Sequence, residues 1–467
     1  MASAAKVWYK GNRHTLGGFL REILNAQVWK EAHEASRDFD RGRSRWRLKP
    51  VCVIGLLIGL DEGDRSLQAR FEEAAKIYDR LFPKRRRSGK IRGFMAALKA
   101  VPLEVLEVLQ KRIQEQLVKE RINPYQVGRW NGVGVDGSKQ NLPRTQAHEA
   151  HYGLGGKKPG LPQRVIVNVV GLRSELLVEW ACGKAKASER QLVMEAIRRL
   201  PQGTMVVGDA GFPGYDWIDE VVGVQGKHVL IRVGANVNLL AEQVRVSLKS
   251  GGRVWLWSKE KRRHPPLVLR LICIARRTKR TVKRKKRGQN GRQKRGDVVR
   301  FYFLTDVLDA KALTNREAWQ LYAKRWPCNE GMFRNWKQTM KCDKAISRTP
   351  EIAERELSTS LLGYVLIQTM ILIARKRRRK REVRISIAAG RKAWRRALEA
   401  MKEGKTTRWF ARELSEAVVD EYDRQGPKST REWPRKKKHK PMKSPKVRRL
   451  HNALKAEGMS LLEAKQA

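Results

Sequence analysis

Two aspartates in this chain each follow a short apolar segment. Asp136 ends the block GVGVD, and Asp209 ends the block VVGD. Because β-branched apolar segments of this length are typical of strands, both carboxylates are expected at strand ends. A third carboxylate, Glu330, lies in a later segment with helical spacing. Three carboxylates brought together in this way would form an oxygen-only site for hard divalent cations such as Mg²⁺.

The chemistry of such a site is phosphoryl transfer. Two ions about 4 Å apart activate a water or a 3′-hydroxyl and stabilise the leaving oxygen of an in-line displacement. An Asp beside a glycine is also typical of a turn or cap, so each block alone favours that simpler interpretation. The choice between a metal site and a simple turn depends on whether the two strands are neighbours.

The order of elements around the two aspartates predicts that they are. Strands are expected at 133–135, 164–170 and 175–182, followed by a helix over 188–200 and a strand at 205–207. This order of three strands, one helix and one strand would place the first and last strands side by side. Asp136 and Asp209 would then lie at the same edge of a sheet.

The third carboxylate belongs to a helix with two cations on one face. Glu330, Arg334 and Lys337 are spaced at i, i+4 and i+7. The alternative is a surface ion pair between Glu330 and Arg334, which contributes only a few tenths of a kcal/mol. The two upstream aspartates favour the catalytic interpretation.

Three blocks, GVDGS, VVGDAGF and YAKRWPCNEGMFRNWKQT, resemble those of bacterial insertion-sequence DDE transposases. The resemblance is to the branch with a Tyr-Arg-Glu-Lys signature and a β-rich insertion before the catalytic glutamate. The signature falls on Tyr322, Arg325, Glu330 and Lys337, with the spacings from Tyr to Arg and from Glu to Lys that the family has.

One spacing departs from the family pattern. Four residues lie between Arg325 and Glu330 where the family usually has three, so Asn329 occupies the expected glutamate position. Glu330 keeps the spacing to Lys337, and Pro327 is compatible with a local bulge that absorbs the extra residue. We therefore expect Glu330 to be the ligand, with Asn329 as the alternative.

The resemblance implies an α/β fold with an RNase H-like core, in which helices flank a mixed sheet. It implies that Asp136 bridges two Mg²⁺ ions, with Mn²⁺ able to substitute, while Asp209 and Glu330 each hold one. It also implies that Tyr322, Arg325 and Lys337 hold phosphates of the DNA end. Arg334 is expected to bind DNA on the same helix face, and Tyr322 has core packing as an alternative role.

Relatives with the insertion stack a flipped base on a tryptophan, since an extruded base exposes a ring face that needs a partner. Trp255 and Trp257 alternate on a predicted strand and face the same side. Trp326, next to Arg325, is a third candidate. Ordinary packing beneath a hairpin is the alternative for the first two.

The charge balance indicates a polyanionic partner. The chain has 467 residues with 101 Lys and Arg against 47 Asp and Glu, for a net charge of +54, and its hydrophobic fraction of 41% is enough for a sizeable core. Clusters at 375–381 and within a basic hairpin tip would contact phosphates. The tip cluster comprises Lys283, Arg284, Lys285, Lys286 and Arg287. Solvated tails have the same composition.

The sequence argues against a membrane protein and against disulfides. The apolar stretch 361–374 contains Gln368 and Thr369 and falls short of a bilayer span, so we expect a buried core helix. The first residues lack an apolar region of signal-peptide type. The five cysteines are widely spaced, with no CxxC pair. A reducing compartment is expected, which is the cytoplasm, or the nucleus if the host has one. For a bacterial protein this means the cytoplasm with its nucleoid.

The resemblance, together with position and charge, predicts three regions in chain order. Residues 1–125 are a helical N-terminal DNA-binding domain, and 126–375 are the catalytic domain, interrupted at 235–300 by a β-rich basic insertion. Residues 376–467 are a basic helical C-terminal region whose last runs are expected to be solvated tails.

The expected activity is cut-and-paste transposition. The protein would bind the terminal inverted repeats of its mobile element as a synaptic homodimer, cleave them and join the 3′-hydroxyls to target double-stranded DNA. One alternative is a metal-dependent nuclease or resolvase that cuts without joining. Another is a decayed relative that only binds DNA.

Overall fold

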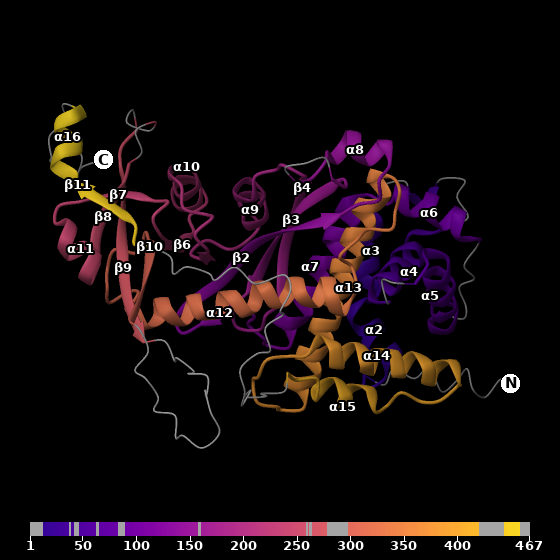
Figure 1. Cartoon of the computed structure of the whole chain (residues 1–467). Coiled ribbons are helices and arrows are strands. Elements are labelled where there is room, and N and C mark those ends of the chain that lie inside the picture. Colours follow the sequence, from indigo (N-terminus) through magenta and orange to yellow (C-terminus); the bar gives the residue numbers. More distant parts are fainter. Residues whose placement is uncertain are drawn as a thin grey trace, which may run out of the picture. The chain divides into compact units, whose positions relative to one another are not determined.

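The chain folds as two compact units, each built from segments that are far apart in sequence (Figure 1). The structure is a computed structural model that describes residues 13–36, 39–41, 46–61, 65–82, 89–156, 160–257, 260, 264–277, 298–419 and 443–457. The first unit comprises residues 1–126, 136–196 and 327–419, and the second comprises 127–135, 197–326 and 420–467.

The first unit is mainly helical. Its helices are α2 (Leu16–Ile23), α3 (Ala26–Ala35), η1 (Phe39–Arg41), α4 (Leu48–Leu60), α5 (Leu67–Leu81), α6 (Ile91–Ala100), α7 (Leu103–Lys119), α8 (Gln146–Tyr152), nearly all of α9 (Glu189–Ile197), the end of α12 (Asn315–Arg334), η4 (Asn335–Thr339), α13 (Pro350–Arg377), α14 (Ile387–Lys402) and α15 (Phe410–Ser415). Its strands are the second half of β2 (Trp130–Asn141), β3 (Gln163–Gly171) and β4 (Leu177–Lys184).

Helix α13 forms the core of the first unit. It contacts α4, α6, α7, α14 and α15, which surround it (Figure 1). Among the described residues it is the one helix long and apolar enough to cross a membrane, but 89% of its most apolar window is buried within the protein. The expected core helix at 361–374 is therefore confirmed, as part of a longer helix.

The second unit is built on a sheet. Its strands are the first half of β2, β5 (Met205–Gly208), β6 (His228–Val233), β7 (Asn238–Ala241), β8 (Gly252–Leu256), β9 (Leu267–Arg277), β10 (Val298–Thr305) and β11 (Lys446–Arg449), and the two-residue β1 (Gln126–Val127) pairs with β2. Its helices are α10 (Tyr215–Asp219), η2 (Glu220–Val224), α11 (Val244–Ser250), the start of α12 and α16 (Leu450–Glu457).

Strand order in the second unit is β11-β7-β8-β9-β10-β6-β5-β2. The strands β2, β5 and β6 run parallel, whereas β6, β10, β9, β8 and β7 form an antiparallel series. In the first unit, β4 pairs antiparallel with β3, which neighbours β2. The expected mixed sheet flanked by helices is therefore confirmed, and β2, β3, β4, α9 and β5 follow one another as expected except that the short helix α8 lies between β2 and β3. The expectation that Asp136 ends its strand is wrong, because β2 continues to Asn141.

The C-terminal basic run contributes an edge strand and a helix. In β11, Lys446 to Arg449 pair in parallel with Asn238 to Ala241 of β7. In α16, Leu450 and Leu454 pack against Trp255 and Trp257 in one buried cluster. The expectation of a solvated tail is therefore wrong for residues 446–449, because they pair with β7. The apolar positions of α16, which follows them, cover the two indoles. The basic hairpin tip at 283–287 lies outside the described residues.

We predict that Leu450→Asp releases α16, because Leu450 is fully buried and a carboxylate there would be unpaired. Amide hydrogen exchange of β7 and β8, followed by mass spectrometry, should accelerate at least about tenfold. The control Lys446→Ala alters an exposed side chain, keeps the backbone amide that donates to the Val237 carbonyl, and should leave exchange unchanged. Unchanged exchange in Leu450→Asp would show that α16 does not hold this edge.

A histidine at the start of β6 makes stability of the second unit depend on pH. His228 Nδ1 lies 2.6 Å from Asp306 Oδ2, and Asp306 Oδ1 accepts a hydrogen bond from the Val229 amide at 2.8 Å. The hydrogen bond to Asp306 raises the pKa of His228 despite partial burial of the ring. A raised pKa in the folded state means that the stabilisation is complete below the unfolded pKa of about 6.5 and is lost as pH rises through the folded value.

The free energy of unfolding of the wild-type protein should therefore exceed that of His228→Asn most at acidic pH. Urea unfolding between pH 5.5 and pH 9, values chosen to bracket the unperturbed histidine pKa of about 6.5, measures the difference between the two. Asp306→Asn is the control, because it removes the partner of His228. In the Asp306→Asn background, adding His228→Asn should change the free energy of unfolding by an amount that does not depend on pH. A difference that grows with pH would contradict the ion pair.

Candidate functional site

Asp136 lies in β2 immediately after the buried segment 132–135, and its side chain is half-buried. Its Oδ1 accepts a hydrogen bond from the Gly137 amide at 2.9 Å. A Cβ added to Gly137 would lie 2.4 Å from the carboxyl carbon of Glu189, so this second carboxylate lies against the backbone next to Asp136. No local pattern singled out Glu189, because an acid in the first turn of a helix is typical of dipole stabilisation.

Asp209 directly follows β5 and is also half-buried. Its Oδ1 accepts a hydrogen bond from the Gly211 amide at 2.7 Å, as in an Asx turn. Asn236 Nδ2 donates to the Ala210 carbonyl at 2.9 Å and so fixes the same loop. The hydrogen bond to Oδ1 thus orients the Asp209 side chain at the strand end. The block VGDAG also favoured a turn at this position.

The strand register relates the two aspartates along the chain. In the second unit, β2 and β5 pair in parallel over three residues, the last of which are Gly134 and Val207. Asp136 lies two residues after Gly134, and Asp209 lies two residues after Val207. The sequence-based prediction that their strands are neighbours is therefore confirmed.

The structure distinguishes Asn329 from Glu330 on α12. Asn329 is fully buried, and its Nδ2 donates to Asn168 Oδ1 of β3 at 2.6 Å. Glu330 is exposed. Because Asn329 joins the helix to the sheet, Glu330 is the residue of the two that presents an oxygen ligand to solvent.

A widened turn follows Arg334. Helix α12 stays α-helical through Pro327, and the five residues of η4 form a π-helical turn closed by the Met340 amide on the Asn335 carbonyl at 2.9 Å. The expectation of a local bulge at Pro327 is therefore wrong, and the irregularity lies further along the chain, in the turn that contains Lys337. A π turn accommodates about one extra residue, so Lys337 does not follow simple α-helical phase from Glu330.

Lys337 connects this turn to the strand that carries Asp136. Its Nζ donates to Ser138 Oγ and to the Lys139 carbonyl, each at 2.6 Å. Burial lowers the pKa of Lys337, while the charges of Asp343 and Glu330 act in the opposite direction. In the first unit, an ammonium group therefore sits beside β2, two residues beyond Asp136, and within electrostatic reach of Glu330.

The remaining signature residues differ in exposure. Tyr322 and Arg325 are buried in the second unit, where the Tyr322 ring centroid lies 4.7 Å from that of Phe303 and the Arg325 guanidinium lies 5.6 Å from the Tyr322 ring. Arg334 is exposed, and so is Trp326, with 63% of its surface accessible. The side chains expected to hold DNA thus fall into a buried pair and an exposed set.

The two tryptophans of the β-rich segment do not offer an open ring face. Trp255 and Trp257 are 1% and 3% exposed beneath α16, and Trp257 Nε1 donates to the His264 carbonyl at 2.8 Å. In this arrangement they pack as the hairpin alternative expects. Trp326 is the exposed member of the three candidates.

The carboxylates fit a hard cation by chemistry, because all three offer only oxygen and none is fully buried. Asp136 and Glu330 belong to the first unit, and Asp209 belongs to the second. Within the part of the chain that the structure describes, no three His, Cys, Asp or Glu side chains gather closely enough to hold a metal ion.

Comparison with known proteins identifies the family. A family model described as a transposase DDE domain matches residues 131–366, half of the chain. The transposase InsG for insertion sequence element IS4 of Escherichia coli K12 is 26% identical over 261 residues, which cover 52% of this chain and 53% of InsG. The chain thus spans about half the length of this curated relative.

Among solved structures, the chain is similar to a piggyBac transposase in a synaptic complex with hairpin DNA. The TM-score is 0.40 at 10% identity, over 88% of this chain and 87% of that chain. A likeness at this level carries no further argument.

The burial of Asn329 predicts opposite effects for two adjacent substitutions. Asn329→Leu should lower the free energy of unfolding by about 1–3 kcal/mol, because it leaves the buried Asn168 Oδ1 without its donor. Glu330→Gln, at an exposed position, should change it by less than about 0.5 kcal/mol. Urea denaturation measures both, and a larger loss in Glu330→Gln would reverse our assignment of the two residues.

Proposed function

Because this chain belongs to the transposase DDE domain family, we propose that it is the transposase of a bacterial insertion sequence. It binds the ends of its element, cuts them in a metal-dependent reaction and joins the freed 3′-hydroxyls to target DNA. The register that sets Asp136 and Asp209 two residues beyond a parallel strand pair carries this proposal. InsG, named as a transposase of an insertion sequence, supports the same assignment.

The strand arrangement supports an RNase H-like core. The order is β4-β3-β2 in the first unit and β2-β5-β6 in the second, with β2, β5 and β6 parallel and β3 antiparallel to β4. The antiparallel strands β7 to β10 precede the helix of Glu330, as expected of the β-rich insertion. We also propose the domain limits expected from the sequence, in which residues 1–125 bind DNA.

Asp136, Asp209 and Glu330 would hold two Mg²⁺ ions, or Mn²⁺ in their place. When bound, such ions activate the attacking oxygen and stabilise the leaving one. The turn at Asp209 leaves one carboxylate oxygen directed away from the Gly211 amide. Lys337, held on Ser138, supplies a fixed positive charge for a phosphate next to Asp136.

The exposed side chains of α12 are suited to the DNA end. Arg334 offers a bidentate guanidinium to phosphate, and Trp326 offers an aromatic face to an unpaired base. Tyr322 and Arg325 remain part of the proposed site, but burial means that Arg325 must turn outward before it contacts a phosphate. Trp255 and Trp257 would stack a base only after α16 moves away.

Double-stranded DNA, both element ends and target, is the proposed partner, and the net charge of +54 favours it. The basic residues 283–287 would add phosphate contacts. We propose a homodimer in the synaptic complex and a cytoplasmic, nucleoid-associated location, as expected for an enzyme that acts on bacterial DNA.

Catalysis is tested with a linear DNA that carries the repeats flanking the gene and a supercoiled target, incubated with Mg²⁺ or EDTA and resolved on a gel. Asp209→Asn and Glu330→Gln should each reduce metal-dependent cleavage at least about a thousandfold, a loss of about 4 kcal/mol of transition-state stabilisation. DNA binding should stay within about twofold, because neither change removes a cation.

Asp219→Asn is the matched control, since Asp219 is an exposed carboxylate of the same unit ten residues after Asp209. It should cleave like the wild type. Joint loss of binding and cleavage in Asp209→Asn would indicate a structural role instead. Cleavage without joining by the wild type would identify a nuclease, and binding without cleavage a decayed relative.

A further inference from the structure

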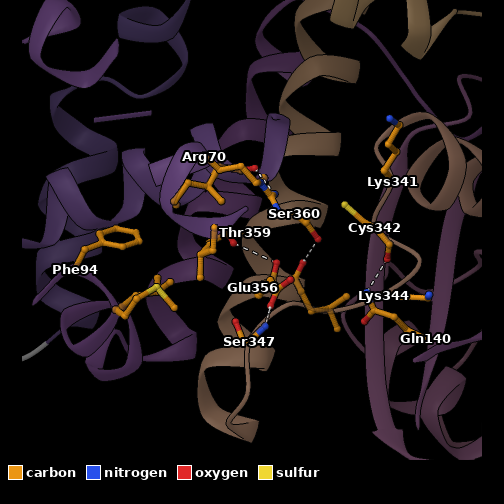
Figure 2. A pocket seen from close by; sticks show the side chains of 17 residues that line it. Arg70, Phe94, Gln140, Lys341, Cys342, Lys344, Ser347, Glu356, Thr359 and Ser360 are labelled. Atoms are coloured by element: carbon orange, nitrogen blue, oxygen red, sulfur yellow. Dashed lines mark hydrogen bonds between the residues drawn. The ribbon is translucent and has the colours of Figure 1, made fainter. Parts of the chain in front are cut away.

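A small pocket opens in the first unit where α4 crosses α13 (Figure 2). Gly55 and Gly59 of α4 and Thr359 and Ser360 of α13 are among the residues that line it. Its volume is about 30 Å³, which holds roughly two water molecules. One side is open, so a larger group can insert one or two oxygen atoms and keep the rest outside.

A buried cation reaches this pocket from α5. Arg70 is 4% exposed, and its Nη2 donates to the Ile58 carbonyl at 2.6 Å. Its Nε is buried and has no hydrogen-bond partner among the described residues. Burying a charged group with an unsatisfied donor is costly unless a ligand supplies the acceptor, so this guanidinium is arranged for an anion.

The other charges around the pocket favour the same sign of ligand. Lys341 and Lys344 line it and are exposed. Figure 2 shows both side chains extended, with their ammonium groups directed away from Arg70. Among the described residues that line it, the one carboxylate is Glu356, which already accepts from the Ile346 amide and the Ser347 amide, each at 2.9 Å. The lining therefore carries three cations against one acid whose oxygens are occupied.

Cys342 and Gln140 limit what the pocket can bind, the first by disfavouring soft metals and the second by closing one side. The buried Cys342 thiol has its pKa raised to about 12, chiefly by burial, with Arg70 opposing the shift. A thiol that stays protonated is a poor ligand for soft metals. Gln140 donates through Nε2 to the Cys342 carbonyl at 2.7 Å and so closes the pocket on the sheet side.

We propose that this pocket is an oxyanion site, in which the buried Arg70 holds a phosphate group and the exposed Lys341 and Lys344 turn toward it. The proposal rests on the proposed function in one respect, since it assigns the phosphate to the backbone of bound DNA. The site would fix one phosphate in the first unit, with Gln140 of β2 as its neighbour on the sheet side. A free phosphate ester has the same chemistry and is the alternative source.

The first arm of the test uses the full chain without DNA. Inorganic phosphate, compared with chloride at equal ionic strength, should raise the melting temperature of the wild type but not of Arg70→Met. The matched control is Arg80→Met, an exposed arginine on the same helix, which should respond like the wild type. An equal response in Arg70→Met would mean that phosphate binds only to the charged surface, and it would overturn the proposal.

A second variant covers the case in which Arg70→Met does not fold. The double substitution Lys341→Gln and Lys344→Gln changes only exposed side chains and should weaken the phosphate response severalfold. An unchanged response in this variant, with the wild type responding, would also overturn the site.

The second arm identifies the source of the phosphate. If it belongs to DNA, Arg70→Met should reduce the slope of log binding constant against log salt by about 0.9, the change expected when one backbone phosphate is no longer neutralised. Inorganic phosphate should also compete with DNA. An unchanged slope with a retained phosphate response would assign the site to a free ester. Failure of cleavage would contradict the proposed function but leave the first arm intact.

Discussion

The close crossing of α4 and α13 is the constraint on which the first unit depends. A Cβ on Gly59 would lie 2.6 Å from the Thr359 carbonyl oxygen and 2.9 Å from the Ser360 Cα, so only glycine permits this approach. Helix α4 and residues 361–374 of α13 are apolar on nearly all sides and must be enclosed by other helices. Their contact therefore fixes the positions of the surrounding helices and leaves the small pocket at its edge.

Helix α13 also anchors the sheet through a polar residue in its apolar stretch. Gln368 accepts a hydrogen bond from the Leu177 amide at 3.0 Å and donates to the Glu175 carbonyl at 2.7 Å. The Leu177 amide and the Glu175 carbonyl lie where the chain enters β4, so the buried Gln368 side chain satisfies backbone atoms at the start of that strand. The same glutamine that argued against a membrane span is thus what joins the core helix to the sheet.

Local patterns predicted much of this structure. The pairing of the strands that carry Asp136 and Asp209 and the helix of Glu330 follow from periodicity and spacing, which act over a few residues. The docking of β11 and α16 did not, because a strand partner so distant in the chain leaves no trace in local composition. Arg70 and Glu189 were missed for a related reason: each is an ordinary helix residue until tertiary contacts surround it. The choice between Asn329 and Glu330 needed burial, which spacing alone does not provide.

The π turn at Asn335–Thr339 has a consequence for how such signatures are compared between proteins. An extra residue in an α-helix rotates every later side chain by about 100°. A π turn takes up one residue within a turn and so restores the original direction. Helical direction, and not the number of intervening residues, thus decides which side chain of α12 and η4 faces β2. In this chain Lys337 lies within that turn, and its Nζ reaches Ser138 Oγ and the Lys139 carbonyl of β2.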